Sequence, residues 1–213
     1  MKPILFNTEM VRAIMEGRKT VTRRIAKYKG FNIADMTPNS KAPYKPGDIL
    51  YVRETWTQEG AQYFYREDIG SDFLSPCETL GGGYPRDCMN FAGCEGCTRT
   101  GQRIHWRPSI HMPKEAARIF LRVTDVYMQR LREIDAEQAV AEGAVKHPHY
   151  VTYGGERCLA IHHARYLKDF ISVWESTIKP ADLPRYGWDA NPWVWVIEFE
   201  RIDRPEVVDV CRQ

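Results

Sequence analysis

The chain of 213 residues contains 43% hydrophobic and 27% charged residues, a composition typical of a folded globular protein. This balance excludes disordered, collagen-like and coiled-coil chains, and no apolar run approaches the roughly 20 residues that a membrane-spanning helix needs. Thirty basic and 28 acidic residues give a formal charge of only +2, so the overall charge indicates no particular partner. The first residues lack the apolar core and cleavage site of a signal peptide, which predicts a cytoplasmic protein whose cysteines are reduced or metal-bound.

Hydrophobic periodicity and turn residues divide the chain into helices and strands. Apolar residues at helical spacing predict helices over residues 7–17, 135–142 and 159–178. Short apolar or aromatic runs predict strands over residues 49–52, 62–66, 117–127 and 193–199. Together these elements predict an α+β protein with a small β-barrel or curved sheet, flanked by about three helices. We expect a single domain spanning residues 1–213.

A basic run follows the first predicted helix. Between Gly17 and Gly30 lie six cationic residues with no acid among them: Arg18, Lys19, Arg23, Arg24, Lys27 and Lys29. Lys19 and Thr22 are three residues apart, so on a helical turn their side chains would share a face. A lysine can serve as the base for a nucleophilic threonine or a water only if its pKa falls, because at a pKa near 10.4 roughly one Lys in 2,500 is neutral at pH 7. The neighbouring arginines favour that fall. The alternative is a solvated basic face that only attracts phosphate groups.

Glu142 is the last residue of the helix predicted over 135–142. Asp135 is the expected N-cap of this helix, and Gly143 lies just past its end. A carboxylate beside exposed helix carbonyls is electrostatically disfavoured, which suits a group that both gives and takes a proton. The alternative is an ordinary surface glutamate in front of a terminating glycine.

Residues 71–102 interrupt the pattern with an insertion that is rich in Gly and Cys and poor in aliphatic side chains. Four thiolates can complete a tetrahedral structural zinc site, and the insertion supplies Cys77, Cys88, Cys94 and Cys97. Such a metal would explain how a segment without aliphatics holds a shape, although the wide spacing of the upstream pair departs from a second CxxC motif. His105 could replace one cysteine. A redox pair and free thiols are the alternatives, and no organic cofactor is indicated.

Aromatic residues could form stacking platforms for bases beside a basic groove. The candidates are Trp56, Trp106, Tyr186, Trp188, Trp193 and Trp195. Alternation within residues 193–196 predicts that one of the two tryptophans there is buried in the core and the other faces outward.

Five segments, in this order along the chain, resemble the ASCH domain, a PUA-like β-barrel family. The N-terminal signature spans Ile14-Met15-Glu16-Gly17-Arg18-Lys19-Thr20-Val21-Thr22-Arg23-Arg24, and the others are residues 44–52, 120–126, 134–143 and 194–199. The adjoining Val52-Arg53-Glu54-Thr55-Trp56 is most similar to ASCH proteins carried by bacteriophages and prophages.

This resemblance implies a nucleic-acid or nucleotide ligand. Compact bacterial members of the family include an amidohydrolase that removes the acetyl group from N4-acetylcytidine with a Lys, a Thr and a Glu, and its motif falls on Lys19, Thr22 and Glu142. By this resemblance Lys19 deprotonates Thr22 or a water, Glu142 handles the proton delivered to the leaving amine, and Arg24 holds the oxyanion or the base. The candidate binding residues are Arg18, Arg23, Arg24, Arg53, Glu54, Trp56 and Trp188.

The compact enzyme has no equivalent of the insertion at residues 71–102, and fold-level resemblance does not settle a substrate. The alternative function is therefore a non-catalytic RNA- or DNA-binding module of phage origin, with zinc shaping its binding face.

Overall fold

The structure is a computed structural model that describes residues 1–27, 31–32, 37–38, 41–59, 61–69, 106–145, 148, 150–153, 156–159 and 163–205. Its strands are β1 (Lys2–Leu5), β2 (Val21–Ile25), β3 (Phe31–Asn32), β4 (Thr37–Pro38), β5 (Ile49–Arg53), β6 (Trp56–Glu59), β7 (Gln62–Tyr65), β8 (Phe120–Arg130), β9 (Tyr150–Tyr153), β10 (Glu156–Leu159) and β11 (Trp193–Ile202). Its α-helices are α1 (Thr8–Met15), α3 (Ala136–Ala141), α4 (His163–Ser176) and α5 (Leu183–Tyr186). Short 3-10 helices are η1 (Arg66–Ile69), η2 (Ser109–His111), η3 (Lys114–Ala116), η4 (Leu131–Glu133) and η5 (Pro180–Asp182). No helix in these ranges has the length and apolar character to span a membrane.

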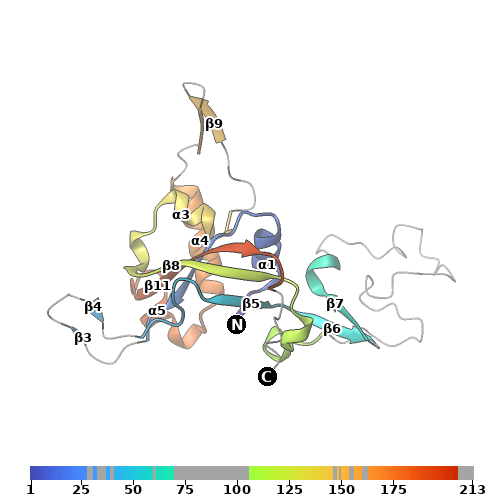
Figure 1. Ribbon diagram of the computed structural model, residues 1–213. Coiled ribbons are helices and arrows are strands. Elements are labelled where there is room, and N and C mark those ends of the chain that lie inside the picture. The colour runs from blue at the N-terminus through green and yellow to red at the C-terminus, as the bar shows by residue number, and fades with distance from the viewer. Residues whose placement is uncertain are drawn as a thin grey trace, which may run out of the picture. The chain divides into compact units, whose positions relative to one another are not determined.

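A five-stranded sheet of order β1-β5-β8-β11-β2 is the main element. Figure 1 shows its two long strands, β8 and β11, side by side, and their pairing is antiparallel. Strand β2 pairs antiparallel with the other side of β11. Three two-stranded sheets join β3 to β4, β6 to β7 and β9 to β10. The α+β class is confirmed, and the described strands follow the order of an open sheet with β1 and β2 at its edges. The barrel expected of an ASCH domain stays a prediction.

The chain divides into two compact units. The first unit comprises residues 1–2, 13–50 and 119–213, and the second comprises residues 3–12 and 51–118. The single domain over residues 1–213 stays a prediction, and the Cys-rich insertion at 71–102 lies outside the described residues.

Helices α3 and α4 pack on one face of the sheet in the first unit. The buried cluster that joins them contains Val21, Leu131, Ile134, Ala136, Ala139, Val145, Tyr166, Phe170, Trp174, Val194 and Val196. The two valines of β11 are fully buried in this cluster, whereas Trp193 and Trp195 are only partly buried. The prediction that one tryptophan is buried and the other exposed is therefore wrong, because residues two apart in a strand share a face.

The termini of α3 follow the predicted capping. The backbone N–H of Gln138 donates to Asp135 Oδ1 at 2.8 Å, so Asp135 is the N-cap. Glu142 is the C-cap residue, and Gly143 follows with a φ of +72°. The left-handed backbone that glycine adopts readily thus ends the helix as expected.

Candidate active site

The fold brings Lys19 and Glu142 together although 123 residues separate them in the sequence. They form an isolated antiparallel β-bridge. Lys19 Nζ donates to Glu142 Oε2 at 2.8 Å, to the Glu142 carbonyl at 2.7 Å and to the Val21 carbonyl at 2.7 Å. The two side chains are 0% and 6% exposed. The ion pair is therefore held in a nearly water-free environment.

The pair lies along the outer edge of β2. The Thr20 carbonyl accepts a hydrogen bond from the Phe199 N–H of β11 at 2.8 Å. The Ala26 N–H donates to the Trp193 carbonyl of β11 at 2.9 Å. Because backbone groups alternate in direction along an antiparallel strand, the carbonyls of Val21 and Arg23 point away from β11. Lys19 Nζ satisfies the carbonyl of Val21, which would otherwise be a buried acceptor on an unpaired edge. The amine thus has a structural role at the strand edge as well as its contact with Glu142.

Arg23 is the second cation on the Glu142 carboxylate. Its NH1 donates to Glu142 Oε1 at 3.0 Å, and its NH2 donates to Gln138 Oε1 at 2.6 Å and Gln129 Oε1 at 3.2 Å. The guanidinium also lies 5.9 Å from the centroid of the Phe170 ring. With its side chain 0% exposed, Arg23 holds Glu142 in place rather than projecting toward a ligand.

Burial and the Glu142 carboxylate act in opposite directions on the pKa of Lys19. Burial lowers the pKa of Lys19 below its ordinary value, the Glu142 carboxylate raises it, and Arg24 and Arg23 lower it further. The net direction is downward because removing an ammonium from water disfavours its charged form. Burial also lowers the pKa of Arg24, against the attraction of Glu142. Two cations, Lys19 and Arg23, thus contact the Glu142 carboxylate, and the pKa of Lys19 moves in the direction that a catalytic base requires.

Gly143 is what allows Glu142 to approach Lys19. A Cβ at Gly143 would lie 2.7 Å from the Cβ of Ala13 and 2.9 Å from the Cβ of Lys19. Both distances are shorter than real Cβ contacts, so only glycine fits here. Arg18 supports the same loop, since its NH1 donates to the Val145 carbonyl at 3.0 Å. The predicted binding residue Arg18 therefore contacts the chain just after the α3 terminus.

Thr22 lies in strand β2 and not on a helical turn. It pairs with Ile197 of β11 and is 1% exposed. The prediction that Lys19 and Thr22 share a helix face is wrong, because pairing with β11 extends the backbone here. Side chains alternate along a strand, so Thr22 and Arg24 lie on the sheet face opposite Arg23.

Glu54 belongs to the second unit, where it forms a buried ion pair. Arg118 donates to both its carboxylate oxygens, from Nε at 2.9 Å and from NH2 at 2.8 Å. Burial raises the pKa of Glu54 above its ordinary value, and the guanidinium opposes this shift. Arg118 also donates to Asp68 at 2.6 Å and lies 4.0 Å from the centroid of the Tyr65 ring. The predicted binding residue Glu54 is therefore part of the interior of this unit.

The remaining predicted binding residues have partners within their own units. Arg53 NH1 donates to the carbonyl of Ile110 at 3.2 Å. Trp56 is 3% exposed, with the Arg107 guanidinium 5.1 Å from its ring centroid. Trp188, in the first unit, packs against the buried cluster, and its ring centroid lies 6.4 Å from that of Phe170 in a T-shaped arrangement. In this arrangement Trp56 presents no exposed ring face for a base.

Sequence reasoning missed Gln138 as a member of the site. It lies four residues before Glu142, and residues at that spacing share a face of a helix. Arg23 NH2 donates to Gln138 Oε1 at 2.6 Å and to Glu142 from NH1, so both partners lie on the face of α3 that Arg23 contacts. The same spacing rule could have found Gln138 once Glu142 had been chosen.

The predicted zinc ligands Cys77, Cys88, Cys94 and Cys97 lie outside the described residues. Within the described ranges, no group of three or more His, Cys, Asp or Glu side chains is placed to hold a metal ion.

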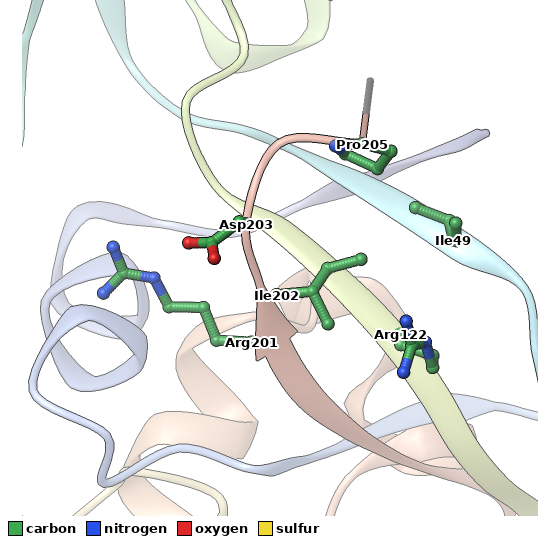
Figure 2. Close-up of a pocket in the computed structure, with 6 residues that line it drawn as sticks. All are labelled: Ile49, Arg122, Arg201, Ile202, Asp203 and Pro205. Carbon is green, nitrogen blue, oxygen red and sulfur yellow. The ribbon is translucent and has the colours of Figure 1, made fainter. Parts of the chain in front are cut away.

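A groove of about 630 Å³ lies elsewhere in the first unit (Figure 2). Its described lining residues are Ile49, Arg122, Arg201, Ile202, Asp203 and Pro205. Figure 2 shows Arg201 and Asp203 on one side of the end of β11, with Arg122 and Ile49 on the other. Arg122 donates to Glu200 at 3.2 Å. The two guanidiniums do not converge on one point, so the groove offers no focused anion site.

Comparisons with known proteins identify no family for this chain. No family model matches the sequence, and no curated protein does. Among solved structures, a protein described with the family model DUF984, from Enterococcus faecalis V583, aligns over 95% of this chain and 82% of its own at 12% identity, with a TM-score of 0.34. A likeness this weak gives no information about the function of this chain.

Proposed function

We propose that this chain is an amidohydrolase that removes the acyl group from the exocyclic amine of a modified cytosine of the N4-acetylcytidine type. Lys19, Thr22 and Glu142 carry the reaction. The observation that supports this most is the 2.8 Å hydrogen bond between Lys19 Nζ and Glu142 Oε2 in a buried setting. The proposal includes the PUA-like barrel and a zinc-stabilised insertion at residues 71–102.

The buried pair can generate a base and an acid in a single step. Transfer of one proton along the hydrogen bond from Lys19 to Glu142 gives a neutral amine and a neutral carboxylic acid. Burial favours the neutral amine of Lys19, because its ammonium loses its hydration in the interior. Arg23 donates to Glu142 at 3.0 Å and so keeps this carboxyl group oriented beside Lys19. The lowered pKa of Lys19 favours the neutral amine that a general base needs.

The proposed reaction proceeds by attack on the amide carbonyl. Neutral Lys19 accepts the proton of Thr22 Oγ1, or of a water, as that oxygen forms a new bond to the carbonyl carbon. The C–N bond then breaks, and Glu142 delivers its proton to the departing exocyclic amine. With Thr22 as nucleophile, a water subsequently hydrolyses the acyl ester and restores the hydroxyl. The products are the free cytosine amine and a carboxylic acid.

Arg24 is the proposed group for the negative charge that develops on the carbonyl oxygen. It follows Thr22 by two residues in β2, so the two side chains share a face of the sheet. A guanidinium on that face can donate hydrogen bonds to an oxyanion formed by attack from Thr22. Because Thr22 is 1% exposed, the acyl group has to displace neighbouring side chains to reach it.

Release of cytidine from N4-acetylcytidine, followed by chromatography, tests the proposal. We expect Lys19→Met and Glu142→Gln to lower turnover by about 10²-fold or more, the contribution of a general acid or base. Thr22→Val keeps the shape of the side chain and removes its hydroxyl, so it tells threonine from water as the nucleophile. The matched controls are Lys168→Met and Thr124→Val, since both residues are exposed. Absence of cytidine release by the wild-type protein, or full activity of both Lys19→Met and Glu142→Gln, would overturn the proposal.

A further inference from the structure

A second cavity in the first unit, of about 180 Å³, combines positive charge with aromatic rings. Its described lining residues are Ala26, Lys27, Arg130, Arg185, Tyr186, Ala190, Pro192 and Trp193. Three of these eight residues are cationic, two are aromatic and none is acidic. The cavity brings together two features of the sequence that the proposed reaction does not use. Lys27 comes from the basic run, and Tyr186 and Trp193 belong to the set of candidate aromatic residues.

The guanidinium of Arg130 is held in a fixed position beside the cavity. It lies 4.6 Å from the centroid of the Trp193 ring, and its NH1 donates to the Asn191 carbonyl at 3.0 Å. A guanidinium carries five N–H donors in a planar fork, which matches the oxygens of a phosphate or carboxylate. Because this guanidinium is already ordered, binding of an anion costs less side-chain entropy than it would at a free arginine.

The other two cations come from different parts of the first unit. Arg185 lies 5.0 Å from the centroid of the Tyr186 ring. The Tyr186 carbonyl accepts a hydrogen bond from Trp174 Nε1 at 2.9 Å, which ties this segment to α4. Lys27 follows Ala26, whose backbone is bonded to β11. Tertiary structure, and not a local run of charge, therefore assembles the three cations around one cavity.

Trp193 adds a polar group without a partner. Its indole Nε1 is buried and makes no hydrogen bond with any residue that the structure describes. A buried donor without an acceptor is unfavourable and uncommon in folded proteins. An acceptor atom bound beside the ring would remove this penalty.

We propose that this cavity is a binding site for the phosphate group of a nucleotide or a polynucleotide. The three cations supply the charge, the Arg130 fork supplies directed donors, and a phosphate oxygen is the acceptor for Trp193 Nε1. Pockets that enclose a whole small-molecule ligand measure about 300–1,000 Å³. At about 180 Å³ the cavity suits a single charged group, with the rest of the nucleotide outside it.

Phosphate binding at this cavity does not depend on the proposed hydrolysis. If the proposed function is also correct, the two together indicate that the substrate is phosphorylated. Thr22 and Ala26 lie four residues apart, on and just after β2, which corresponds to about 13 Å of extended chain at about 3.3 Å per residue. A phosphate bound at the end of β2 would thus anchor a substrate whose acylated base extends along the strand toward Thr22.

Calorimetric titration with inorganic phosphate, cytidine 5′-monophosphate, cytidine and a short single-stranded oligonucleotide tests the inference. None of these probes carries an acyl group, so binding is measured whether or not the chain hydrolyses amides. We expect phosphate and the monophosphate to bind, cytidine to bind at least tenfold more weakly than its monophosphate, and affinity to fall with added salt. An oligonucleotide that binds tenfold more tightly than the monophosphate identifies a polymer as the source of the phosphate, whereas equal binding identifies a free nucleotide.

Charge-removing variants locate the binding. Arg130→Gln and Arg185→Gln should each weaken binding of the monophosphate at least tenfold. Trp193→Phe should also weaken it, because it removes the Nε1–H donor while keeping an aromatic ring. Arg165→Gln removes an exposed arginine of α4 and serves as the matched control. If Arg130→Gln unfolds the protein, the exposed Arg185 still tests the site. Equal binding of cytidine and its monophosphate, or wild-type affinity in both arginine variants, would overturn the inference.

Discussion

Replacing Gly143 by alanine, with Gly17→Ala as its matched control, isolates the packing that holds Glu142 against Lys19. Both glycines have left-handed backbones, with φ values of +72° and +73°. An alanine at either position pays about 1–2 kcal/mol for that conformation. A Cβ at Gly17 meets nothing within 4 Å, whereas a Cβ at Gly143 would lie 2.7 Å from Ala13 and 2.9 Å from Lys19. Overpacking of this kind costs about 1–3 kcal/mol more.

Urea unfolding of the two variants measures the difference. We expect Gly143→Ala to lower the free energy of unfolding by about 2–5 kcal/mol, and Gly17→Ala by about 1–2 kcal/mol. Alanine also reduces the entropy of the unfolded chain, by about 0.4–1 kcal/mol, but this effect is the same at both sites and cancels in the comparison. Equal destabilisation by the two substitutions would refute the close approach of Gly143 to Ala13 and Lys19.

Three further predictions concern the buried charges and the cysteines. Arg118→Ala leaves the Glu54 carboxylate buried without its partner, so we expect a loss of about 3–5 kcal/mol in urea unfolding; a loss below about 1 kcal/mol would contradict the ion pair. Because burial lowers the pKa of Lys19 in the folded state, the unfolded chain binds more protons between that pKa and about 10.4. The free energy of unfolding should therefore rise with pH across this window, and Lys19→Met should abolish that rise; an unchanged slope would show that Lys19 is not shifted downward. Metal analysis of the purified protein should find about one zinc ion per chain, lost in the double variant Cys94→Ser, Cys97→Ser, and a metal-free wild-type protein would refute the zinc site.

Local patterns were sufficient to predict several elements and their ends. The Asp135 cap and the Gly143 terminus depend on residues close together in the sequence, where turn chemistry acts directly. The strand predicted over 117–127 was found as β8 (Phe120–Arg130), with both ends three residues later. The helix predicted over residues 159–178 was found as α4 (His163–Ser176), which buries Tyr166, Phe170 and Trp174. The two tryptophans of β11 were misassigned because the alternation rule was applied to residues two apart.

Local patterns did not show which residues of the site meet. They singled out Lys19 and Glu142 separately and the family resemblance joined them, but their contact depends on a bridge between residues 123 apart. The pair of Glu54 and Arg118, which are 64 residues apart, was missed for the same reason. A charged residue gives no local signal of whether its partner is solvent or a distant side chain. Only the fold shows that Glu54 has an internal partner.

The most direct test of the account is release of cytidine from N4-acetylcytidine by the wild-type protein, by Glu142→Gln and by the exposed control Lys168→Met, measured side by side. Glu142→Gln keeps the size of the side chain and removes the charge that faces Lys19 at 2.8 Å. The account predicts release by the wild type and by the control, with turnover in Glu142→Gln reduced by about 10²-fold or more. Equal release by all three proteins, or no release by the wild type, would contradict it.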